Sequence, residues 1–122
     1  MSVRSEVIRL LDEIPALGGR NYADERPEGE GLPHTVVLDG VSQTMEQEGD
    51  ARTTAWRHLL QVDLWEDATV ASEATRDTVI HALDGQQIAG AFRLRVGSAD
   101  RIYDPDRRLA HTAITLRTVR LR

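Results

Sequence analysis

The side chains best suited to metal binding are four histidines, His34, His58, His81 and His111. They lie 23 to 30 residues apart in the chain, and no HxH or HxxxH pair places two imidazoles beside one metal ion. The chain has no cysteine, which excludes thiolate metal sites and a thiol nucleophile. The sequence therefore predicts neither a metal site nor a cofactor.

Side chains for acid–base or nucleophilic catalysis are present but not arranged for it. Paired carboxylates occur at 12–13, 24–25, 66–67 and 104/106, yet none stands beside a serine or histidine in a catalytic pattern. All 15 basic residues are arginine, so a Schiff-base lysine and a P-loop lysine are both excluded. The sequence predicts that the protein is not an enzyme.

With metal binding and catalysis not predicted, the charged side chains indicate a protein that binds other proteins. Arg93 and Arg95 fall on the same side of one predicted strand, and Arg117 falls on a neighbouring strand. Arginine pairs bidentately with carboxylates at interfaces. We expect these arginines to meet acidic loop residues of a second, identical copy, namely Asp24, Glu25, Glu28 and Glu30. The other candidate contact residues lie in an acidic loop and a hairpin tip: Asp24, Glu25, Glu28, Glu30, Gln47, Glu48, Asp50 and Arg52.

Length and charge set the class of protein. The 122 residues are 40% hydrophobic and 29% charged, which predicts a single folded domain over residues 1–122. The formal net charge is −5, whereas a specific duplex-DNA binder usually has a basic face. No apolar run approaches the roughly 18 residues of a membrane span, so no membrane partner is expected.

Two helices are predicted from apolar periodicity. Residues 3–14 place apolar side chains at i, i+3, i+4 and i+7, and Pro15 follows. Residues 69–84 form the second helix, in which Ile80 falls on the polar side. Its buried stripe is expected to be Ala71, Ala74, Thr75, Thr78, Val79, Ala82 and Leu83.

Strands account for most of the rest of the chain. Residues 35–46 and 53–65 form a long hairpin that projects beyond the domain, and residues 19–33 form a long loop without periodicity. Residues 88–96 and 109–120 also alternate, with a turn expected at Gly97-Ser98 and a short segment at 101–103. The predicted class is α+β, a mostly antiparallel (mixed) sheet with the long hairpin and with both helices on one face.

Several short sequence segments along the chain resemble those of the tail terminator (tail-completion) proteins of long-tailed bacteriophages, a minor tail protein family. They are, in order, Arg20-Asn21-Tyr22, Leu32-Pro33-His34, Gln61-Val62-Asp63-Leu64-Trp65, Asp104-Pro105-Asp106-Arg107-Arg108 and His111. The resemblance implies a structural virion protein without an active site. It implies a homohexameric ring at the tail-neck junction of the virion, assembled in the host cytoplasm, that caps the head-proximal end of the tail tube.

The same resemblance implies the partners. These are further copies of the chain, the major tail tube protein, and a head-tail connector or stopper protein. Because the ring is acidic, DNA is expected to pass through its lumen without specific binding. Two alternatives stay open: another neck component, such as a head-closure or head-tail connector protein, or a small cytoplasmic ligand-binding or enzymatic α+β domain.

Overall fold

The computed structural model describes residues 3–25, 31–46, 54–68, 73–88, 92–104 and 108–120. These segments contain two α-helices, one 3₁₀ helix and six strands, which confirms the predicted α+β class. In chain order the elements are α1 (Val3–Asp12), η1 (Pro15–Leu17), β1 (Asn21–Ala23), β2 (His34–Glu46), β3 (Thr54–Asp67), α2 (Glu73–Leu83), β4 (Gln87–Ile88), β5 (Phe92–Asp104) and β6 (Leu109–Arg120).

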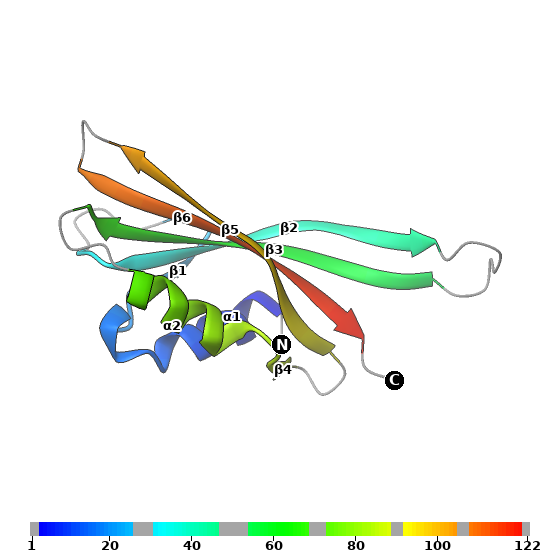
Figure 1. Ribbon diagram of the computed structural model, residues 1–122. Coiled ribbons are helices and arrows are strands. Elements are labelled where there is room, and N and C mark those ends of the chain that lie inside the picture. The colour runs from blue at the N-terminus through cyan, green and yellow to red at the C-terminus, as the bar shows by residue number, and fades with distance from the viewer. Residues whose placement is uncertain are drawn as a thin grey trace.

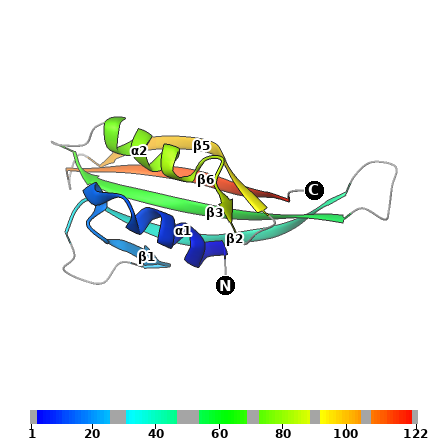
Figure 2. The same ribbon diagram turned by 90° about the horizontal axis from the view of Figure 1, so that it is seen from below.

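The strands form one mixed sheet in the order β1-β2-β3-β6-β5-β4. The pairing of β1 with β2 is parallel, and the other four pairings are antiparallel. Figure 1 shows both helices on the same side of this twisted sheet, and Figure 2, seen from that side, shows α1 in front of the β1–β3 half and α2 in front of the β5–β6 half. The predicted placement of the helices on one face is therefore confirmed.

Helix α1 follows its apolar pattern, with Val7 and Leu11 fully buried. It ends at Asp12, two residues before the predicted end, and the chain continues into η1. Proline cannot donate a backbone hydrogen bond and disfavours helix in the preceding residue. The α-helix therefore ends before Pro15, where the 3₁₀ helix η1 begins. Gly18 caps the end of η1 with a left-handed backbone conformation (φ 56°).

Part of the segment predicted as one long loop is a strand, so that prediction was wrong for 21–23. Strand β1 pairs with residues 35–37 of β2. Asn21 fixes it from both sides: its amide nitrogen donates to Asp12 Oδ1 at 2.9 Å, and its amide oxygen accepts from Thr35 Oγ1 at 2.7 Å. A strand of three residues is too short to show alternation, so only its partners reveal it.

The long hairpin of β2 and β3 is confirmed and extends past the helices (Figure 1). Near its base, Val37 pairs with Val62. On the other side of β3, Val62 pairs with Ile114 of β6, so all three side chains lie on the helix side of the sheet. The hairpin therefore has an anchored half, over the helices, and a projecting half.

The turn predicted at Gly97-Ser98 is absent; β5 continues through it as one strand of 13 residues. The register against β6 shifts between Val96 and Ser98, which marks a bulge in β5. A bulge inserts one residue without ending the strand. The short segment at 101–103 is accordingly part of β5.

Helix α2 is rotated from its predicted orientation. Ala74 and Thr78, expected to be buried, are exposed, whereas Ile80, expected on the polar side, packs against the core. Val79 and Leu83 are fully buried, as predicted. Buried apolar area stabilises by about 25 cal/mol per Å², so turning Ile80 inward gains more than burying alanine and threonine. Residues 69–72, including Ala71, lie outside the described part of the chain.

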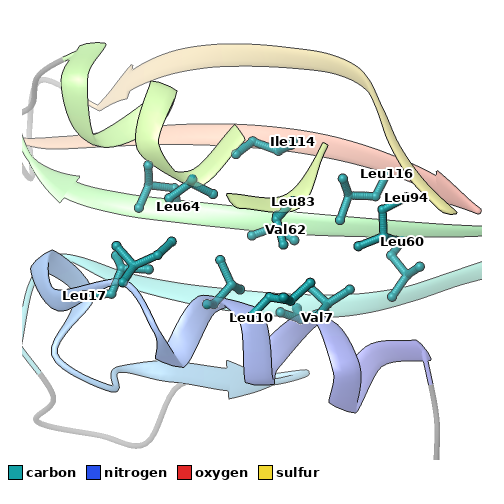
Figure 3. Packing of buried hydrophobic residues seen from close by; sticks show 14 of the residues in the cluster. Val7, Leu10, Leu17, Leu60, Val62, Leu64, Leu83, Leu94, Ile114 and Leu116 are labelled. Atoms are coloured by element: carbon teal, nitrogen blue, oxygen red, sulfur yellow. The ribbon is translucent and has the colours of Figure 1, made fainter. Parts of the chain in front are cut away.

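The core lies between the helices and the sheet. Figure 3 shows that α1, β3, β6 and α2 all contribute side chains to one apolar layer. The buried set is Val7, Leu10, Leu11, Ile14, Leu17, Val37, Leu60, Val62, Leu64, Val79, Leu83, Ile88, Leu94, Ile114 and Leu116. Most of these residues are leucine or valine. Because both described α-helices pack on this side, the opposite face of the sheet carries neither of them.

Candidate assembly surface

The sheet face that carries no helix, here called the open face, collects the alternate residues of each strand. One row across it runs from His34 of β2 through Trp65 of β3 and His111 of β6 to Ile102 of β5, each paired with the next. Ile102 is 57% exposed. The open face thus presents an apolar and aromatic row that neither α1 nor α2 covers.

Aromatic rings stack along this row. Trp65 and His111 lie parallel, with ring centroids 4.1 Å apart and an interplanar angle of 1°. His34 follows at 6.5 Å from Trp65, and Tyr22 of β1 lies 6.2 Å from His34. Neighbouring rings shield each other, and His34 is only 4% exposed. We call these four residues the aromatic row.

An acidic side chain, Asp63 of β3, lies beside the aromatic row on the same face of the sheet. Asp63 Oδ1 lies 3.0 Å from His111 Nε2 and accepts a hydrogen bond of 2.7 Å from the Gln61 amide. The Asp63 side chain is 12% exposed. A carboxylate this far out of water needs polar partners, and these contacts provide them.

We predict that the stacked pair is energetically coupled. In a double-mutant cycle of Trp65→Leu and His111→Leu, the coupling free energy should be about 0.5–1.5 kcal/mol, the range of aromatic pairs. Urea unfolding of the four proteins measures it. The matched cycle uses Tyr22→Leu with His111→Leu, since two strands separate these residues, and should be additive within about 0.5 kcal/mol. Equal coupling in both cycles would contradict a specific stack.

The three arginines predicted from the sequence do share the open face. Arg95 of β5 pairs directly with Arg117 of β6, and Arg93 pairs with Val119. Arg95 and Arg117 are exposed and Arg93 is half-buried, with an Nε that is shielded from water and has no hydrogen-bond partner. We call Arg93, Arg95 and Arg117 the arginine cluster. Within the described segments none of the three lies in an ion pair with an acid.

Of the acidic residues predicted to meet these arginines, the structure describes Asp24 and Glu25. Asp24 follows β1 with a φ of 65°, and its carboxylate lies 2.7 Å from the guanidinium of Arg4 in α1. Glu25 is exposed. Asp24 therefore already has an intramolecular partner. The remaining acidic and hairpin-tip candidates lie outside the described residues: Glu28, Glu30, Gln47, Glu48, Asp50 and Arg52.

The aromatic row is the feature that sequence reasoning missed. Alternation alone places Trp65 on the same side of its strand as Gln61 and Asp63. It does not reveal that His34 and His111, 31 and 46 residues away in the chain, pair with Trp65 on adjacent strands. Only the strand register brings the three rings together.

A cavity of about 230 Å³ lies at one end of the core, below the usual ligand-pocket range of roughly 300–1,000 Å³. Its lining residues are Ala16, Leu32, Pro33, Glu66, Asp67 and Thr75. Among the described residues there is no group of three metal-ligating side chains, and neither helix is long and apolar enough to cross a membrane.

One buried ion pair on the helix side is structural in character. Glu66 Oε1 lies 3.6 Å from the Arg101 guanidinium, with side chains 4% and 15% exposed. Glu66 and Arg101 come from β3 and β5, which flank β6. Removing one member of such a pair leaves an uncompensated buried charge. The pair therefore links β3 to β5 at the end of the core where Glu66 also lines the cavity.

Comparison with known proteins identifies the fold and the family. Among solved structures, a chain of the virion of a native gene transfer agent (GTA) particle aligns with a TM-score of 0.68 at 20% identity, covering 98% of this chain and 93% of that one. No curated protein matches the sequence. The family model described as tail completion protein gp17 matches residues 5–120. Since that match spans nearly the whole sequence, the chain belongs to the tail completion protein gp17 family of phage structural proteins.

Proposed function

We propose that this protein caps the head-proximal end of the phage tail tube as a ring of six copies and stops further addition of tube subunits. The match to the tail completion family over residues 5–120 carries this proposal. The likeness in fold to a chain of a gene transfer agent virion is consistent with a place in a particle. The described surface supports it too, because the open face of the six-stranded sheet offers a broad area for protein contacts.

The other face of the ring joins the head. In this proposal the capped tail presents a surface to a head-tail connector or stopper protein, at the tail-neck junction. DNA passes through the lumen of the ring. A formal charge of −5 on each copy opposes retention of phosphate, so passage does not require specific binding.

The experiment is to mix the purified protein with tail tubes that are still growing from the tube protein. We expect the protein to bind one end of each tube and the tubes to stop lengthening, as seen by negative-stain electron microscopy. Native mass spectrometry should detect a species near 82 kDa, six times the 13.6 kDa chain, on or off the tube. Tubes that lengthen normally with the protein in excess would overturn the capping role. Binding to the head connector but not to the tube would favour a head-closure or connector protein instead.

A further inference from the structure

The arginine cluster and the outer surface of α2 carry opposite charges on opposite sides of the chain. Arg95 and Arg117 face each other across the sheet, and like charges directly opposite destabilise a strand pair. On α2, Glu73 and Asp77 are exposed and stand one turn apart. Like charges at this spacing destabilise a helix. Each copy therefore holds two repulsive pairs that a partner of opposite charge would relieve.

The acidic side of α2 is suited to close approach. Between Glu73 and Asp77 lies Ala74, and Thr78 follows, with its hydroxyl turned back to the Ala74 carbonyl at 2.8 Å. These small side chains leave the carboxylates as the most prominent groups there. The only ion pair on Asp77 within the described residues is to Arg76, at a long 3.5 Å. The carboxylates are thus accessible to a second set of guanidinium groups.

We infer that the arginine cluster of one copy binds Glu73 and Asp77 on α2 of the next copy. This inference rests on the proposed ring. The helices and the open face lie on opposite sides of the sheet (Figures 1 and 2), so one chain cannot make the contact with itself. A contact between two different patches is heterologous, and such contacts close into rings when the rotation allows. Val119, 41% exposed and paired with Arg93, adds apolar area beside the charges.

A second copy fits the cluster better than nucleic acid does. Duplex DNA binding is driven by many neutralised phosphates, commonly 6–10. The cluster has three arginines in a chain of net charge −5. Every copy carries the complementary carboxylates in fixed positions, whereas nothing in the cluster selects a nucleic acid.

Cross-linking at introduced thiols tests the contact. The chain has no cysteine, so Thr78→Cys together with Val119→Cys places the only two thiols on the two proposed surfaces. A short bismaleimide should link neighbouring copies into a ladder of covalent oligomers on a denaturing gel. The matched control combines Val119→Cys with Ala16→Cys, exposed on η1, and should give far less. The ladder should also be lost in 1 M salt, where screening length falls to about 3 Å.

Each result decides the inference. A ladder no stronger than that of the control, or one unchanged when Arg95→Glu and Arg117→Glu are added, would overturn it. Retention of duplex DNA by the unmodified protein, lost with the same two charge reversals, would assign the cluster to nucleic acid. The tube-capping experiment is independent of these results. Capping by the unmodified protein without a specific ladder would leave the proposed function standing and reject only this interface.

Discussion

Replacing Leu11 with alanine should lower the free energy of unfolding by about 2–5 kcal/mol, the cost of deleting a buried leucine side chain. Leu11 is fully buried on α1 between the helices and the sheet. A domain of this size has a total stability of roughly 5–15 kcal/mol, so one substitution removes a large share. Urea unfolding followed by circular dichroism measures the loss.

The matched control is Ile102→Ala, which also removes an aliphatic side chain but at a position 57% exposed on the open face. We expect a change within about 0.5 kcal/mol, as is usual for surface positions. The contrast separates burial from residue type. Comparable losses at the two positions would contradict the layered core, because they would mean that Ile102 is as well packed as Leu11.

Reversing the charge of the two exposed arginines of the cluster should abolish tail completion, and reversing the acids of α2 as well should restore it. The first variant carries Arg95→Glu with Arg117→Glu, and the second carries Glu73→Arg with Asp77→Arg. Facing like charges across an interface cost several kcal/mol, which corresponds to at least roughly a 100-fold loss of affinity per contact. Each variant alone is expected to fail because every copy in a ring supplies both surfaces. The combined variant inverts both and recovers complementarity.

The measurement is complementation of a phage that lacks its own copy of this gene, scored by infectious titre and by tail length in electron micrographs. Arg108→Glu is the matched control, an exposed arginine outside the cluster, and should complement normally. Circular dichroism establishes that each variant folds. Full activity of either single-surface variant, or a combined variant that stays inactive, would reject the pairing of these two surfaces.

The structure adds a second candidate for the acidic surface that meets the arginine cluster. From the sequence, the arginines were predicted to meet the loop acids Asp24, Glu25, Glu28 and Glu30. Asp24 pairs with Arg4 across 20 residues of chain, a contact that no local pattern encodes. Glu73 and Asp77 of α2 are not among the contact residues that the sequence predicts. The expectation for the four loop acids stays a prediction, and two of them, Glu28 and Glu30, lie outside the described residues.

The sequence by itself determined the helices and strands whose apolar residues recur at a regular spacing. Alternation over β2, β3 and β6, and the i, i+3, i+4 pattern of α1, were read correctly because burying one face of an element repeats a chemical signal many times. Placement of Arg93 and Arg95 on one side of β5 follows from the same alternation, since strand side chains switch faces at every residue.

Tertiary structure alone decided the rest, because it depends on contacts between residues far apart in the chain. Strand β1 exists through its pairing with β2, the Gly97 bulge through its pairing with β6, and the rotation of α2 through the gain from burying Ile80. The stack of Trp65 on His111 needs the β3–β6 register, in which a shift of one residue would turn every side chain to the other face. The sequence therefore determined which residue types are available for contacts, and the fold determined which of them lie next to one another.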